Sequence, residues 1–228
     1  MTPNDLKDRF RIDVDDVAPH PEDTSGCLWS DADIFSYMDE AHAEFVERTL
    51  YLYDVLEVPF EAACDSIALP RRIIEVRGPV YLKNEGTLLQ DINAEQRVWA
   101  SDYGTMVSSS PFGADSSGRP NAYSLDIVRG QIKLSPTPLE ADMLLIPAFL
   151  EARPIVDGNS RFELNNTRHI RALLNGMKRL AYMKQDADVY DPEQALRWGA
   201  LFERDIERVH GEILRQRRTP GETRYGGL

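Results

Sequence analysis

The stretch SDADIFSYMDEAHAEFVERTLYLY, residues 30–53, carries the strongest helical pattern of the chain and decides the predicted fold. Ser30, with Asp33 three residues later, is typical of a capping box at the start of a helix. Apolar residues then recur at helical spacing and predict one buried stripe, while acidic residues occupy the other face. The stripe comprises Ile34, Met38, Ala41, Phe45 and Leu52, and the acidic residues are Asp39, Glu40, Glu44 and Glu47. The pattern predicts a helix from Ser30 to about Tyr53.

Two more helices are predicted near the C-terminus. Asp191 followed by Pro192 is a favourable start, because Asp caps the first turn and Pro needs no hydrogen-bond partner there. The apolar residues of this long helix are Trp198, Phe202, Ile206, Val209 and Ile213. The preceding helix follows the apolar spacing from Ile170 to Ala181, which Gly176 weakens slightly.

A short helix is predicted over residues 5–17, with Leu6 and Phe10 on its apolar side. Its acidic residues, Asp13, Asp15 and Asp16, lack the Gly and Glu positions of a calcium-binding loop. They are therefore expected to be solvated carboxylates.

Residues 55–155 are predicted to form an antiparallel β module, because Gly, Pro and β-branched residues replace the helical pattern. Strands are expected at 73–77 and 80–82, and a hairpin is expected from 123–128 and 131–134. A loop is predicted at 108–121, because this stretch is rich in Ser, Gly and Pro. A last strand is expected at 142–149, with its end placed at a sheet edge by Pro147.

Taken together, these elements predict an α+β, mainly α fold: a bundle of long antiparallel helices with an inserted antiparallel β module and a flexible C-terminal tail. The expected domains are a helical bundle of residues 1–54 and 156–214, a β-rich lobe of residues 55–155, and an extended tail of residues 215–228. The tail has too little apolar content to fold alone.

Composition excludes several classes of protein. The 228 residues carry a net charge of −12, with −13 over residues 1–69 and +3 over residues 166–228. With 42 % hydrophobic residues the chain has enough apolar side chains for a core, and it contains no apolar run long enough to span a membrane.

No signal peptide is expected, and so acidic a surface disfavours free duplex DNA as a ligand. Cys27 and Cys64 are too few for a disulfide framework, which favours a reducing compartment. The charge asymmetry fits either oppositely charged partners or ordinary solvated helix faces.

No catalytic, metal-binding or cofactor-binding residue is predicted. The metalloprotease, serine hydrolase and phosphate-binding motifs are absent. The histidines, at positions 20, 42, 169 and 210, lack metal-ligand spacing. A general acid and base among the many carboxylates stays open.

Several residue strings resemble the head-to-tail connector or adaptor proteins of tailed bacteriophages, also called tail tubular protein A-like. At the N-terminus these are DLKDRFRIDVDD, residues 5–16, and LWSD, residues 28–31, followed by Tyr37 and Ala41. Near the C-terminus AYMKQDADVYDP, residues 181–192, is similar to a signature of that family. Further matching residues are Leu69-Pro70, Ile73 to Val76, Gly118-Arg119-Pro120, Tyr123 and Tyr225-Gly226-Gly227.

The resemblance implies a virion structural protein without catalysis. Such proteins form a ring, usually of twelve copies, between the portal and the tail nozzle or tube, and double-stranded DNA passes through without specific binding. It further implies location in the virion neck, passage through the host cytoplasm during assembly, and a chain that is monomeric when isolated. No membrane and no cofactor are implied.

Two sets of residues are the candidates for these contacts. The basic tail is expected to order on the portal, through Arg215, Arg217, Arg218, Arg224 and Tyr225. The candidates for helix packing or contacts between copies are Phe45, Tyr182, Trp198 and Phe202. Two other functions remain open: a non-viral helical adaptor that binds a protein, or a cell-wall hydrolase carried by a virion.

Overall fold

The chain divides into two compact units in a computed structural model. The structure describes residues 2–17, 26–64, 66–84, 86–91, 117–126, 129–160, 162–164, 166–185 and 190–217. One unit, here the helical unit, consists of Met1–Leu52 and Glu151–Leu228, and the other, the β unit, consists of Tyr53–Leu150. The β unit is thus inserted between two halves of the helical unit in sequence.

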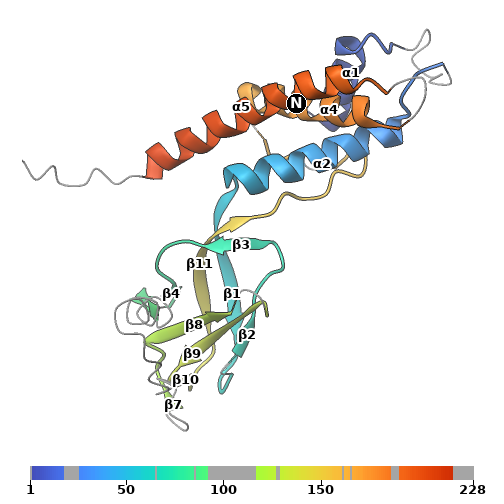
Figure 1. Cartoon of the computed structure of the whole chain (residues 1–228). Helices are drawn as coiled ribbons and strands as arrows, with labels where there is room; N and C mark the ends of the chain where they lie inside the picture. The colour runs from blue at the N-terminus through green and yellow to red at the C-terminus, as the bar shows by residue number, and fades with distance from the viewer. Residues whose placement is uncertain are drawn as a thin grey trace, which may run out of the picture. The chain divides into compact units, whose positions relative to one another are not determined.

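The helical unit contains α1 (Pro3–Asp13), α2 (Asp31–Thr49), α4 (Thr167–Met183) and α5 (Pro192–Arg217) (Figure 1). Helix α4 contacts the other three and is buried on almost every side between His169 and Lys178, with Arg171 exposed. Gly176 permits this packing: a Cβ atom there would lie 3.0 Å from Ala41 Cβ and 3.1 Å from the Phe202 ring. The residue that weakens the sequence pattern is therefore where α4 approaches α2 and α5 most closely.

Helix α2 begins where the sequence predicts, and its end differs. Ser30 and Asp33 form the predicted capping box. The helix ends at Thr49, because Leu50 adopts the left-handed conformation (φ 53°) and Thr49 Oγ1 donates to the carbonyl of Phe45 at 2.6 Å. The chain then enters strand β1 (Tyr53–Phe60). That strand was missed, although Val55 and Val58 are residues that favour strands.

The prediction of a mainly α protein built as a bundle of long antiparallel helices is wrong. Of the described residues, 42 % are helical and 26 % lie in strands, so the protein is mixed α/β with several antiparallel sheets. Only four helices occur in the described part, and α1 and α4 have 11 and 17 residues. The error lies in the share assigned to the helices, because apart from Tyr53 and Asp54 every described strand falls within the residues predicted as the β lobe.

Two larger sheets and one strand pair make up the β unit. The first sheet has the order β1-β11-β4-β5, from β1, β11 (Asp142–Leu150), β4 (Tyr81–Leu82) and β5 (Thr87–Leu88), and β3 (Ile73–Val76) also pairs with β11. The second has the order β2-β9-β8-β6, from β2 (Ser66–Ala68), β9 (Gln131–Ser135), β8 (Ala122–Asp126) and β6 (Gln90–Asp91). A parallel pair is formed by β7 (Ser117–Gly118) and β10 (Thr137–Pro138). The predicted hairpin is confirmed as the antiparallel pair β8–β9, and most of the predicted loop at 108–121 lies outside the described residues.

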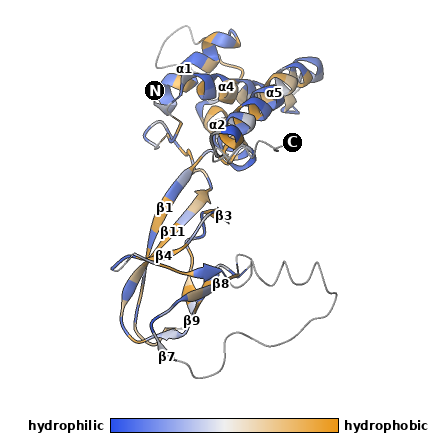
Figure 2. Cartoon of the chain, turned by 90° about the vertical axis from the view of Figure 1, so that its left-hand side faces the viewer, coloured by the Kyte–Doolittle hydropathy of each residue, from blue (hydrophilic) through white to orange (hydrophobic). Residues whose placement is uncertain are grey.

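Strand β11 is central to its sheet, so the expectation that Pro147 makes it an edge strand is wrong. It pairs with β1 on one side and with β3 and β4 on the other, and Figure 2 shows it in hydrophobic colours along most of its length. Pro147 is tolerated because it falls between the stretches that pair with β3 and β4. There its carbonyl accepts a hydrogen bond from the Arg77 amide at 2.8 Å, and no amide hydrogen is needed.

The free edge of β1 is protected against further pairing. Among the described residues β1 pairs with β11 alone. The amide of Val55 is bonded to the Asp54 carboxylate at 2.8 Å, and Pro59, on the same side of the alternation, has no amide hydrogen. Charge and proline at an edge disfavour addition of a foreign strand.

Candidate functional site

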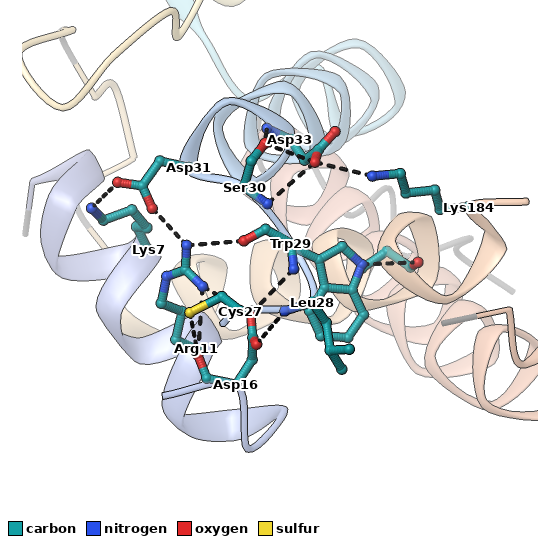
Figure 3. Close-up of polar contacts among 11 residues, drawn as sticks. Lys7, Arg11, Asp16, Cys27, Leu28, Trp29, Ser30, Asp31, Asp33 and Lys184 are labelled. Carbon is teal, nitrogen blue, oxygen red and sulfur yellow. Dashed lines mark hydrogen bonds and ion pairs between the residues drawn. The ribbon is translucent and has the colours of Figure 1, made fainter. Parts of the chain in front are cut away.

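The segments that carry the sequence resemblance meet at the N-terminal end of α2 and the C-terminal end of α4. We call this region the junction; it comprises Lys7, Arg11, Asp16, Leu28, Trp29, Ser30, Asp31, Asp33, Ala181, Tyr182 and Lys184. Figure 3 shows most of these side chains, converging from α1, the residues before α2 and the end of α4. Up to 152 positions of sequence separate residues that contact one another here, as between Trp29 and Ala181.

Arg11 is the centre of the junction. Its residue is 7 % exposed, and its guanidinium donates to Asp16 Oδ2 at 2.8 Å, to the Trp29 carbonyl at 3.0 Å and to Asp31 Oδ1 at 2.6 Å (Figure 3). A planar guanidinium with several fixed donors suits such a set of acceptors better than a lysine would. One side chain thereby joins α1, the turn after it and the start of α2.

Asp16 is buried in the same network. It is 5 % exposed and accepts hydrogen bonds from the Leu28 amide at 2.7 Å and the Trp29 amide at 3.4 Å, besides the Arg11 pair. Asp13, at the end of α1, forms an ion pair with Lys178 at 2.7 Å. The expectation that these acidic residues are solvated is therefore wrong for Asp16, because Arg11 and the amides of Leu28 and Trp29 surround its buried carboxylate. Asp13 is exposed even though it forms this ion pair. Asp15 is exposed, as expected.

Trp29 connects the junction to the end of α4. The indole is 1 % exposed, and its Nε1 donates to the Ala181 carbonyl at 3.3 Å. Its ring meets Phe10 and Tyr182 edge to face, each with centroids 5.8 Å apart. The Tyr182 carbonyl in turn accepts from the Asp191 amide at 3.1 Å, immediately before α5. Trp29 thus occupies the point where both halves of the helical unit join.

The carboxylates at the start of α2 have lowered pKa values. Burial alone would raise the pKa of Asp31, but hydrogen bonds from Lys7 and Arg11 outweigh it and lower the pKa below its usual value. For Asp33, the hydrogen bond from Ser30 is the largest cause of a lowered pKa, against a smaller opposing effect of burial, and Lys184 at 3.0 Å adds to the lowering. Both charges also lie in the first turn of α2, where the helix dipole favours an anion.

The predicted contact residues have separate locations. Phe45 and Phe202 are fully buried in the helical core, so neither side chain is available to a second copy. Trp198 is half-buried beneath Lys178, whose Nζ lies 4.2 Å from the ring centroid, and Tyr182 packs against Trp29.

The predicted tail begins within a helix. Arg215 is exposed on α5 and its Nε donates to the Gly211 carbonyl at 3.1 Å. Arg217 is the last residue of α5, so the expected tail is helical for its first three residues. Arg218, Arg224 and Tyr225 lie outside the described residues.

The junction is suited to holding segments in a fixed arrangement. Each charged side chain of the junction has a charged or backbone hydrogen-bond partner. Buried side chains that have two or more such partners are restricted in their motion. No group of three or more His, Cys, Asp or Glu side chains in the described ranges is placed to hold a metal ion. Within the same ranges, no helix combines the length and apolar content that a membrane span requires.

Comparison with protein-family models and with curated proteins finds no match to this chain.

Proposed function

We propose that this chain is a head-to-tail adaptor of a tailed bacteriophage. In this proposal it forms a ring between the portal and the tail nozzle or tube, and DNA passes through the ring. The chain has a structural role in the virion neck and no catalytic one, after passing through the host cytoplasm during assembly.

The observation that carries the proposal is that the resemblance segments contact one another. Arg11 and Asp16 belong to the first segment, Trp29 and Asp31 to the second, and Tyr182 to the third, and all meet in the junction. Strings that matched a family by chance would have no reason to meet in space. Their meeting supports a common structural origin for the three matches.

The division of the chain is a second support. The β unit, Tyr53–Leu150, is one continuous insertion in the sequence of the helical unit, between Leu52 and Glu151. An inserted β lobe within a helical domain is the organisation that the resemblance implies. A net charge of −13 over residues 1–69 also suits a channel that DNA must pass without adhering.

The proposal is tested by mixing the purified chain with the portal protein of the same phage and imaging the product by negative-stain electron microscopy. We expect a ring of this chain on the portal and none without it. A protein-binding adaptor of another kind would leave the portal bare. A hydrolase would clear cell-wall substrate, and replacing one or two carboxylates would abolish that clearing.

A further inference from the structure

Helix α5 displays a line of arginines on its exposed side. Arg197, Arg204, Arg208 and Arg215 are all exposed and are separated by 7, 4 and 7 residues. At about 100° per residue these positions fall within about 20° of a single line, and they span about 27 Å of helix. Figure 1 shows α5 as the longest helix of its unit. Four like charges at this spacing form a continuous basic edge.

These arginines are only weakly engaged by the described part of the chain. Arg208 pairs with Asp205 at 3.0 Å while remaining 45 % exposed, and Arg197 lies over the Trp198 ring at 5.6 Å. Arg215 bonds to a backbone carbonyl within its own helix, and Arg204 forms no ion pair with a described residue. The guanidinium groups therefore retain donors for another surface.

The outer face of α2 is complementary to this line. Its exposed positions are Ala32, Ser36, Glu40, Ala43 and Glu47, besides Arg48 at the rim. Small side chains allow another helix to approach closely. Glu40 and Glu47 are seven residues apart, about 10.5 Å along the helix, which equals the spacing of Arg197 from Arg204 and of Arg208 from Arg215.

Within one chain the two faces cannot meet. The apolar faces of α2 and α5 are buried against α4 and each other, and Glu40, Glu47 and the four arginines of α5 are exposed. The ionic contact between the two helices lies at the rim, where Arg48 of α2 pairs with Glu203 of α5. Contact between two different faces of identical chains is heterologous, and such contacts close into rings when the rotation permits.

We propose that the arginine line of α5 binds the outer face of α2 on a second copy of this chain, with Glu40 and Glu47 as its ionic partners. This inference rests on the proposed function, because it names the contact between neighbours in the ring. Charge complementarity and the matched seven-residue spacing select a second copy over other occupants.

Charge reversal tests the contact without the portal. One variant carries Arg204→Glu and Arg215→Glu, and the other carries Glu40→Arg and Glu47→Arg; all four positions are exposed, so unchanged melting is the control for folding. We expect the wild-type chain to self-associate weakly at low ionic strength in sedimentation velocity, and added salt to weaken this. Each variant alone should associate at least about tenfold more weakly, and an equimolar mixture of both should recover the association.

Several results would overturn the inference. One is a wild-type chain that stays monomeric at low salt and at its highest soluble concentration. Another is association that neither variant alters, or that the mixture fails to recover. The third is binding of duplex DNA that Arg204→Glu abolishes, which would assign the line to phosphate groups. Rings on the portal are scored separately, so rings formed equally by both variants would refute this contact and leave the proposed function standing.

Discussion

Replacing Arg11 with methionine should destabilise the helical unit by about 3–5 kcal/mol. The side chains of Arg11 and Asp16 are 8 % and 4 % exposed, and breaking a buried pair by removing one partner leaves the other charge uncompensated. The Asp31 contact adds little, at most about 1 kcal/mol, because that carboxylate is 40 % exposed. Methionine retains much of the apolar volume, so the loss measures charge and hydrogen bonding.

The assay is urea unfolding followed by tryptophan fluorescence, to which Trp29 beside Arg11 contributes together with Trp99 and Trp198. The matched control is Arg153→Met in the same unit, which removes a pair with Glu163 at 3.4 Å from an arginine that is 47 % exposed. The control should lose less than about 1 kcal/mol. A loss from Arg11→Met as small as that of the control would refute the assignment of Arg11 as the centre of the junction.

Three further predictions follow from the same contacts. Gly176→Val should destabilise the helical unit by about 1–3 kcal/mol in urea unfolding, because the added side chain has no space between α2 and α5, and stability equal to wild type would contradict the close approach. The pKa values of Asp31, Asp33 and Glu203 lie below their usual values, so their contribution to stability is present above about pH 4.5 and is lost as the pH falls through the lowered values. This is measured as the melting temperature at a series of pH values. Asp33→Asn should reduce the fall in melting temperature at acid pH, and an unchanged fall would contradict the role of Asp33. Deleting residues 218–228 preserves α5 and should leave melting unchanged while docking on the portal is lost; undiminished docking would remove the tail from the contact.

Local signals in the sequence were sufficient for the helices. The capping box at Ser30 and the Asp191-Pro192 start are set by short-range hydrogen bonds, and both are present in the structure, where Asp191 accepts from the amides of Glu193 and Gln194 at 3.0 Å. The end of α2 was misplaced because Leu50 must adopt a left-handed backbone, which an apolar side chain does not signal.

Long-range partners explain the remaining errors. Pro147 favours an edge position because proline has no amide hydrogen to donate. In the structure β3 and β4 pair with β11 on either side of Pro147, so no donor is needed there. Asp16 resembles any acidic residue in a polar turn until Arg11 and the amides before α2 surround it. No local pattern indicates that Asp16 pairs with Arg11, five positions earlier, or that the amides before α2 join them, and none indicates the gap beside Pro147.

The arginine line of α5 was present in the sequence as a 7-4-7 spacing and was missed. The prediction places the basic contact residues in the tail from Arg215 onward, because the helix before it is most clearly marked by its apolar stripe. Exposure of Arg197, Arg204 and Arg208 in the structure is what separates this line from the buried face of the same helix.

The most direct test of the central claim is electron microscopy of the purified chain mixed with its phage's portal protein. The account predicts closed rings of this chain on one end of the portal, and single copies when the portal is omitted at physiological salt. A portal that stays bare at saturating concentrations of a correctly folded chain would contradict it.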